Sequence, residues 1–232
     1  MSLKEDLSTK VKETFKESWL RTDGIVVPST EDLGLGNTSK DIDVTILYAD
    51  ISSSTELVQN YKDWLASEIY KNFLYCCSKI IKQEGGEIRS FDGDRIMGIF
   101  IGNSKNTSAA RCALKINWCV INIIQKEHDD HYKDRSNYKL KHTCGIDSSK
   151  IMAIRSGIRG SNDLVWVGRS ANYAAGLNDL DHNYTTWITS DVYGNLHESV
   201  KITADGKNMW EKQHWQKRNI SVYKSNYWWS ID

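Results

Sequence analysis

The sequence contains almost no proline, no long apolar run and no excess of charge of either sign. Pro28 is the only proline, and no apolar stretch approaches the roughly 20 residues that a membrane-spanning helix needs. The charged N-terminus lacks the apolar core of a signal peptide. Thirty basic and thirty acidic side chains cancel, so no overall field attracts nucleic acid or an anionic membrane. We therefore expect a cytoplasmic protein without a membrane or nucleic-acid partner.

The cysteines show no metal-binding pattern. Their number is odd, and no two of them have the CxxC spacing that is typical of zinc sites. Most lie in apolar helix or strand patterns, which favours reduced thiols in the core of a cytosolic protein. The five are Cys76, Cys77, Cys112, Cys119 and Cys144.

The 232 residues contain no repeat or low-complexity tract and fit one substantial domain. We expect an amphipathic helix at residues 3–20 within an N-terminal extension at residues 1–40, and one folded domain at residues 41–232. In order, the domain is expected to hold a buried strand at 43–51, a helix at 62–83, a hairpin at 86–100, a helix at 107–125, strands at 139–147 and 150–158, a short strand at 164–168, a helix at 171–180, and late strands at 201–206 and 220–225.

The order of these elements is β-α-β-β-α-β followed by further strands. This order is typical of an α+β fold with a ferredoxin-like antiparallel sheet and both helices on one face. In such a fold the first strand lies beside the hairpin. The end of strand 43–51 and the hairpin turn are then expected to meet at one edge of the sheet.

Acidic residues occupy both of these places. Asp50 ends the first strand, and Asp92 and Asp94 flank Gly93 in the hairpin turn. Carboxylates held close together repel each other unless a cation lies between them, and hard divalent cations prefer such oxygen ligands. Two metal ions a few Å apart stabilise both oxygens of a phosphoryl transfer. The alternative is that Asp92-Gly93-Asp94 only supplies turn chemistry, which we favour for Asp92.

A short polar stretch follows Asp50. It runs through Ser52, Ser53, Ser54 and Thr55 toward a helix. Backbone N–H groups at such a turn suit the phosphates of a nucleotide. The alternative is an ordinary serine N-cap.

Four segments together resemble the class III nucleotidyl cyclases in order and spacing, over residues 43–191. They are ADISSSTEL (49–57), GGEIRSFDGDRIMGIF (85–100), CGIDSSKIMAIRSG (144–157) and WVGRSANYAAGL (166–177). The resemblance implies a catalytic domain in which Asp50, Asp94 and the Ile51 carbonyl bind two Mn²⁺ or Mg²⁺ ions. It also implies a homodimer, in which Asn172 positions the ribose of a nucleotide bound to the partner's aspartates.

Two departures bear on the base. Where adenylyl cyclases carry a Lys and an Asp that read adenine, this chain has Ser90 and Val165. Loss of both polar groups should abolish adenine discrimination. Residues 89–95 and 160–169 instead resemble the pyrimidine cyclases of bacterial Pycsar antiphage defence. Tyr48 is a candidate for narrowing the base pocket to pyrimidine size, with a core tyrosine as the alternative.

A third departure concerns catalysis. Gly176 stands where the family has its transition-state Arg. Some cation must still balance the charge that develops at the α-phosphate. Arg169 is the nearest candidate, with Arg155 and Arg159 further away in sequence.

The resemblance implies a homodimeric uridylate cyclase that converts UTP to 3′,5′-cyclic UMP and pyrophosphate, for a separate effector protein of antiviral defence. A cytidylate cyclase acting on CTP remains open, because the two bases differ at one edge only. So does a catalytically inactive nucleotide sensor. An RNA-binding module is disfavoured, because the hairpin has an acidic turn in place of a basic stacking motif.

Overall fold

The computed structural model describes residues 2–133 and 135–231, and its residues group into two compact units. Unit 1 comprises the chain up to Asp43 together with Lys150–Gly168, and unit 2 comprises Val44–Ser149 and the chain from Arg169 onward. The division falls inside two long strands, β2 (Thr38–Ile51) and β5 (His142–Ile158). The predicted boundary near residue 40 stays a prediction.

Unit 1 contains the N-terminal helix and short pieces of sheet. Helix α1 (Leu3–Lys16) begins with a capping box between Ser2 and Glu5 and ends four residues earlier than predicted, because Glu17 is extended. Strand β1 (Leu20–Asp23) pairs in parallel with the start of β2, and β6 (Ser161–Val167) pairs antiparallel with the end of β5. A single 3₁₀ turn, η1 (Thr30–Asp32), lies in the connector.

The prediction of separate strands at 139–147 and 150–158 was wrong. Residues 142–158 form the one strand β5, so the two stretches are continuous, and 139–141 lie before it. The polar residues Ser148, Ser149 and Lys150 suggested a turn, but their backbone stays extended. Strand β7 pairs with its first part, at 144–146, and β6 pairs with its second part, at 152–158.

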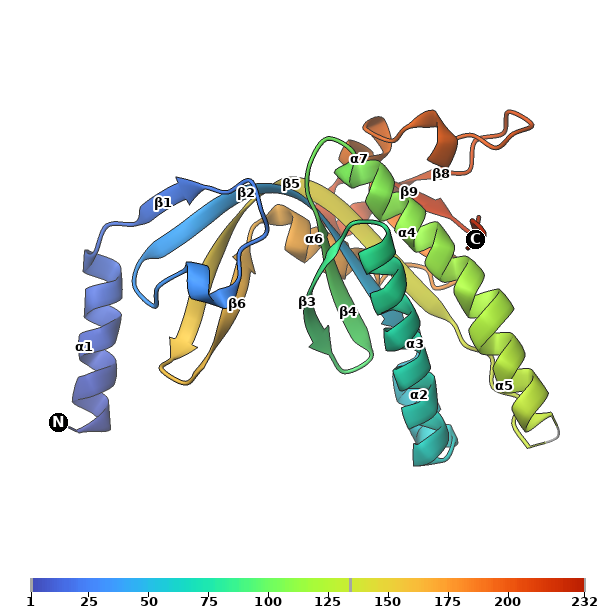
Figure 1. The fold of residues 1–232 in the computed structure, drawn as a ribbon, viewed down its shortest axis with the longest axis horizontal. Helices are drawn as coiled ribbons and strands as arrows, with labels where there is room; N and C mark the ends of the chain where they lie inside the picture. The colour runs from blue at the N-terminus through green and yellow to red at the C-terminus, as the bar shows by residue number, and fades with distance from the viewer. Residues whose placement is uncertain (1, 134, 232) are drawn as a thin grey trace. The chain divides into compact units, whose positions relative to one another are not determined.

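The sheet of unit 2 is mixed. Its strand order is β3-β4-β2-β5-β7-β9-β8, where β3 is Glu87–Asp92, β4 Arg95–Phe100, β7 Thr186–Thr189, β8 Glu211–Trp215 and β9 Ile220–Ser225 (Figure 1). Strands β5 and β7 run parallel, whereas β2–β4, β3–β4, β7–β9 and β8–β9 are antiparallel. The expected α+β class and hairpin are confirmed, but the purely antiparallel sheet is corrected, since the connection that carries α6 crosses over and returns the chain in parallel.

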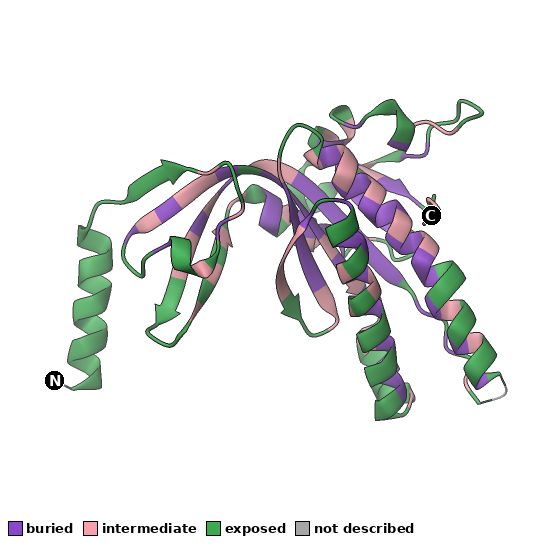
Figure 2. Cartoon of the chain, viewed as in Figure 1, coloured by how far each residue is buried: buried purple, intermediate pink, exposed green. Residues whose placement is uncertain are grey.

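Helices cover both faces of this sheet. The two predicted helices are α3 (Asp63–Gln83), preceded by α2 (Ser54–Asn60), and α4 (Lys105–Cys119), which continues through a π turn η2 (Val120–Ile124) into α5 (Gln125–Tyr132). The buried sides of α3 and α4 form one large core with Ile188 of β7 (Figure 2). Its neighbour Trp187 points to the other face, because side chains alternate along a strand, and packs there with Leu177 of α6 (Arg169–Leu177).

The C-terminal part contains strands that the sequence pattern did not reveal. Strands β7 and β8 were not predicted, while β9 was. The strand predicted at 201–206 was wrong, since this stretch has only an isolated bridge between Ile202 and Asn208. Short helical turns complete it: α7 (Ser190–Gly194), η3 (Glu198–Val200) and η4 (Gln216–Arg218).

No helix among the described residues is both long enough and apolar enough to span a membrane.

Candidate active site

The two predicted acidic turns meet at one edge of the unit 2 sheet. Strand β2 pairs with β4, so Asp50 near the end of β2 lies beside the start of β4. The β3–β4 connection is a two-residue turn, because Asp92 pairs with Arg95. Its first residue, Gly93, has a φ of +61°, a left-handed value that glycine adopts without strain. This tight turn brings Asp94 close to Asp50.

The carboxylates at this edge are only partly neutralised by the protein. Burial, followed by repulsion from Asp94, raises the pKa of Asp50 to about 6. The Arg95 guanidinium and the Ile51 N–H act in the opposite direction. Arg95 Nε lies 3.8 Å from Asp50 Oδ2, which is too far for a hydrogen bond. Asp94 Oδ2 is buried and has no hydrogen-bond partner.

This donor set fits a hard divalent cation. No group of three or more His, Cys, Asp or Glu side chains within residues 2–133 and 135–231 is arranged to hold a metal ion. A cation at Asp50 and Asp94 would therefore take two carboxylates and complete its coordination with other oxygens, as Mg²⁺ typically does with substrate phosphates. The unpartnered oxygen of Asp94 and the raised pKa of Asp50 are what such an ion would relieve. The carbonyl of the buried Ile51 stays a predicted ligand.

Tyr48 and Ser90 lie on either side of Met97 in the same sheet. Met97 of β4 is the register partner of Tyr48 on β2 and of Ser90 on β3, so the three side chains share one face. The Tyr48 hydroxyl donates a hydrogen bond to Met97 Sδ at 3.2 Å, and the Arg95 guanidinium lies 5.7 Å from the Tyr48 ring centroid. Asp50, two residues after Tyr48, is on this face as well. The predicted base-reading and metal-binding residues are therefore neighbours.

The serine turn is only partly free for a ligand. The Ser52 N–H donates to the Lys141 carbonyl at 2.9 Å, and its hydroxyl shares a 2.9 Å hydrogen bond with that of Thr143. Ser53 is in the left-handed region, with a φ of 58°, and its side chain makes no capping bond to α2. The alternative of an ordinary serine cap is therefore not what the structure has. Ser54 and Thr55, which begin α2, remain as candidate phosphate contacts.

Arg169 is engaged in an ion-pair network. Its Nε donates to Asp147 Oδ2 at 3.1 Å, and one terminal nitrogen lies 2.5 Å from Asp191 Oδ2 and 2.6 Å from the Ser148 carbonyl. The Asp147 side chain is fully buried and also accepts a hydrogen bond from Thr189. To act on a phosphate, Arg169 would have to leave these carboxylates, and Asp147 would lose its cation.

Asn172 is on the exposed side of α6. Among the described residues, no hydrogen bond joins its side chain to Asp50, Asp94 or Tyr48 of the same chain. The structure thus brings together Asp50, Asp94, Tyr48 and Ser90, and leaves Asn172 outside this group.

A second arginine, Arg218 of η4, lies against Tyr173 of α6. Where the resemblance places an arginine, a Cβ on Gly176 would lie 3.2 Å from the Trp215 ring, so tryptophan covers this position. The Arg218 guanidinium lies 5.2 Å from the ring centroid of Tyr173, the neighbour of Asn172, and 5.9 Å from that of Trp215. Sequence reasoning missed Arg218, because it comes from a distant turn, η4, with no motif to single it out.

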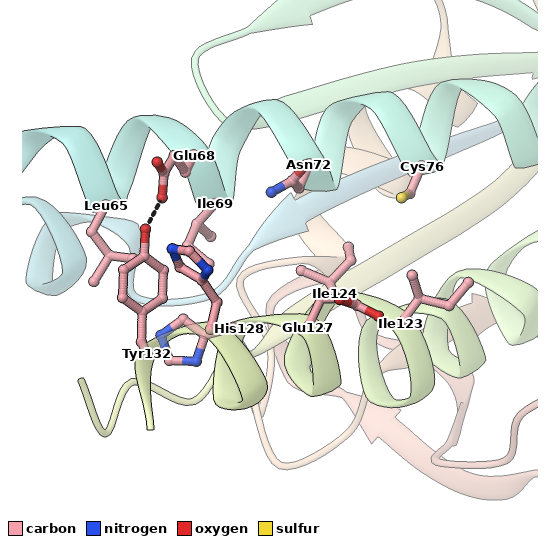
Figure 3. A pocket seen from close by; sticks show the side chains of 11 residues that line it. Leu65, Glu68, Ile69, Asn72, Cys76, Ile123, Ile124, Glu127, His128 and Tyr132 are labelled. Carbon is pink, nitrogen blue, oxygen red and sulfur yellow. Dashed lines mark hydrogen bonds between the residues drawn. The ribbon is translucent and has the colours of Figure 1, made fainter. Parts of the chain in front are cut away.

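A cavity of about 370 Å³ lies elsewhere in unit 2, between α3 and the η2–α5 segment (Figure 3). Apolar side chains such as Ile69 and Ile124 line it together with Glu68, Glu127 and Cys76. None of the predicted site residues takes part in its lining. The cavity is therefore separate from the carboxylate edge.

Comparison with known proteins gives close relatives of one kind. The chain is 48% identical to a uridylate cyclase of Xanthomonas perforans over 234 aligned residues and 47% identical to one of Burkholderia cepacia over 233, with both proteins covered completely in each case. A uridylate cyclase of Rhodovulum sp. is 38% identical, with 98% of each chain covered. A scan against protein-family models found no match.

Solved structures show the fold. The adenylyl cyclase CyaB from P. aeruginosa superimposes with a TM-score of 0.66 and 18% identity, over 84% of this chain and 96% of that one. A bacterial light-regulated adenylyl cyclase gives a TM-score of 0.68 and 20% identity, over 84% and 55%. The chain therefore has the fold of the class III cyclases, as its motifs predicted.

Proposed function

The chain belongs to the uridylate cyclase family, and from this membership we propose that it converts UTP to 3′,5′-cyclic UMP and pyrophosphate. In this reaction the ribose 3′ oxygen attacks the α-phosphorus in line, the bond to the pyrophosphate oxygen breaks, and the hydroxyl proton is released. The observation that carries the proposal is the pair of half-buried, only partly neutralised carboxylates in a chain that matches uridylate cyclases along its whole length.

We propose that Asp50 and Asp94 hold two divalent cations, Mn²⁺ or Mg²⁺, with the Ile51 carbonyl as a further ligand. When bound, such ions lower the pKa of the 3′-hydroxyl and neutralise the triphosphate. The incomplete neutralisation of Asp50 supports this role, since its ion pair with Arg95 is long at 3.8 Å and its pKa stays raised.

The complete site is proposed to form in a homodimer, with Asn172 of the partner subunit orienting the ribose. Two facts support this. Asn172 is exposed on α6, and its side chain has no hydrogen bond to the carboxylate edge of its own chain among the described residues. A residue that acts on the partner's nucleotide needs both features.

The base is proposed to lie against Tyr48 and Ser90. A tyrosine that is fixed by its bond to Met97 limits the space beside Asp50 and favours a single-ring base. Ser90 offers a small hydroxyl where a purine reader would need a longer charged side chain. Replacing Tyr48 by Ala is therefore expected to admit purines and to lower the preference for UTP over ATP by about tenfold or more.

We propose that Arg218 provides the cation that Gly176 cannot. Its guanidinium is held against Tyr173, next to Asn172, and it has no carboxylate partner among the described residues. Arg169, the cation predicted from the sequence, is proposed instead to fix the start of α6 through Asp147 and Asp191. Arg218 would then balance charge at the α-phosphate in the partner's site.

The N–H groups of Ser54 and Thr55 are proposed to contact the outer phosphates, since Ser52 is already bonded to β5. Cyclic UMP is proposed to act as a second messenger of antiviral defence, read by a separate effector protein. This part rests on the resemblance to Pycsar cyclases.

The test is a product assay with the purified full chain. Each of the four ribonucleoside triphosphates is incubated with the protein and Mn²⁺, and the products are separated by mass and retention time. Cyclic UMP from UTP alone is the expected result. If cyclic CMP is the main product, the substrate is CTP instead of UTP. Equal rates on ATP and UTP would refute the proposal that Tyr48 selects a pyrimidine. If no cyclic product forms, the protein is an inactive nucleotide sensor.

A further inference from the structure

Asn178 is a buried polar side chain to which the proposed mechanism gives no role. It follows directly after α6 and is only 5% exposed. Its Nδ2 donates a long hydrogen bond to the Tyr48 carbonyl, at 3.4 Å, and its Oδ1 is buried without a hydrogen-bond partner among the described residues. A buried acceptor that lacks a partner lowers the stability of a fold, so an apolar side chain of similar size would serve folding better.

The usual structural role of asparagine at the end of a helix does not explain this residue. Asparagine is favoured there because it adopts the left-handed conformation that ends many helices. The φ of Asn178 is not positive, and its backbone N–H closes the turn by donating to the Ala175 carbonyl at 3.2 Å. Any residue except proline provides that N–H group. The turn therefore places no demand on the side chain of Asn178.

The end of α6 is packed against β5 without spare room. An added Cβ on Gly145 of β5 would come within 2.1 Å of the Ala174 carbonyl oxygen and 2.8 Å of Asn178 Oδ1. From this tightly packed helix end, Asn178 reaches Tyr48 on the neighbouring strand β2. The opposite orientation of the amide would place its oxygen against the Tyr48 carbonyl oxygen, so the donor faces Tyr48. Asn178 thus connects α6 to the main chain of Tyr48.

Tyr48 is consequently held at both ends. Its hydroxyl donates to Met97 Sδ at 3.2 Å, and its carbonyl accepts from Asn178. The end of α6 also lies near the carboxylate edge. Burial is the main cause that raises the pKa of Asp50, and a smaller part of the increase comes from Asp179, the residue after Asn178. Asn178 therefore acts on the main chain between the proposed base contact and the proposed metal ligand.

We propose that Asn178 is a positioning residue for base selection, which holds the Tyr48 main chain so that the tyrosine ring cannot withdraw from the base pocket. A purine is larger than a pyrimidine, so it enters only if this ring moves back. Fixing the ring at both ends opposes that movement. The inference rests on the proposed function, since it assumes that the base lies against Tyr48. In the proposed dimer, α6 would then carry Asn172 for the partner's site and also secure the base pocket of its own chain.

The test compares uridine and adenine nucleotides on the full chain. Binding of α,β-methylene-UTP and α,β-methylene-ATP, which cannot be cyclised, is measured by calorimetry in Mn²⁺, and kcat and KM are measured with UTP and ATP. Asn178→Leu removes the amide and nearly keeps its size. The preference for the uridine nucleotide should fall about three- to tenfold, through KM, while kcat with UTP stays within about twofold of wild type.

Stability separates positioning from a merely structural role. The urea midpoint of Asn178→Leu should equal or exceed that of wild type, because the unpartnered acceptor is gone. Asn117→Leu is the matched control. Asn117 of α4 is 2% exposed, and its Nδ2 donates to the carbonyls of Asn226 and Tyr227 at 3.1 and 3.0 Å. The control should lower the urea midpoint and keep the wild-type preference for uridine nucleotides.

Two results would overturn the inference. Asn178→Ala is measured beside Asn178→Leu, and a folded form of either variant that keeps the wild-type preference would show that Asn178 does not hold the base pocket. An equal loss of preference in Asn117→Leu would show that the effect follows from destabilisation. Wild-type protein that binds both analogues equally would instead refute the proposed base site, so the two failures are distinguishable.

Discussion

Asp50 and Asp147 lie on the neighbouring strands β2 and β5, and burial raises the pKa of both, yet their surroundings differ. Asp147 has a complete set of partners, because Arg169 and Thr189 bind its two oxygens. Asp50 has a second carboxylate nearby and a guanidinium that stays 3.8 Å away. A buried carboxylate that the protein neutralises holds the fold together. A half-buried carboxylate that the protein neutralises only in part, such as Asp50, can take a cation from outside.

The largest expected effect is on turnover. Asp50→Asn and Asp94→Asn each keep the shape of the side chain but remove the charge that holds a cation. Since loss of even an outer-shell partner commonly costs 10–100-fold, cyclase activity should fall by at least about 100-fold. Measurement of cyclic UMP formation in Mn²⁺ checks this. Asp92→Asn is the matched control in the same turn and should stay close to wild type, whereas an equal loss would show that the whole turn, rather than Asp94, matters.

At Asp147 the expected effect is a loss of folding stability instead of a loss of turnover. Arg169→Ala leaves a fully buried carboxylate without its cation; breaking a fully buried pair costs about 3–5 kcal/mol, and because the Arg169 side chain is 41% exposed we expect about 1–3 kcal/mol in the free energy of unfolding. Urea denaturation measures it. Asp191→Ala removes the exposed partner of the same arginine and should cost less than about 1 kcal/mol. If Arg169→Ala unfolds like wild type but loses turnover, the arginine is catalytic and the contrast between the two aspartates fails.

A smaller effect separates Arg169 of α6 from Arg218 of η4. Arg218→Ala should lower kcat about 10- to 100-fold with little change in KM or in the urea midpoint, because the guanidinium is expected to act on developing charge. Lys217→Ala, the neighbouring exposed cation, serves as control. If Arg218→Ala keeps wild-type activity, Arg218 does not stabilise the charge at the α-phosphate, and Arg169 becomes the candidate again.

The smallest effect is a pH dependence of the cation-free protein. The folded-state pKa of Asp50, about 6, is above its unfolded value of 3.8, so the folded state binds the proton more tightly. Without divalent ions, stability should therefore rise as the pH falls from 7 toward 4, by on the order of 1–2 kcal/mol. Urea titrations in EDTA at several pH values test this. Asp50→Asn should flatten the profile, and a wild-type profile that is flat or rises with pH would contradict the charged state assigned to Asp50.

Local signals in the sequence were reliable where one short segment decides the structure. SFDGDRIMGIF forms the expected hairpin, because a glycine at the first turn position and an apolar strand after the turn suffice. The helix at 63–83 follows from its apolar spacing and the Gly85-Gly86 stop in the same way. The motif order likewise identified the cyclase fold, which the full-length relatives confirm.

Errors arose where distant partners decide. The polar residues at 148–150 suggested a turn, but they stay extended between the part of β5 that pairs with β7 and the part that pairs with β6. The stretch 201–206 has strand-like residues but no neighbour to pair with beyond one bridge. Ser52 looked free for phosphate, yet its hydroxyl bonds to Thr143, 91 residues away in the chain.

The sequence by itself determined the hairpin, the two aspartates at its edge and the family, since these depend on residue types at fixed short spacings. Only the tertiary structure decided which charges are neutralised. Arg169 and Asp147 are 22 residues apart, and Arg218 reaches Tyr173 from another part of the chain. Whether a charge is functional depends on its distances to other charges and on its burial, and both arise only when the strands and helices pack.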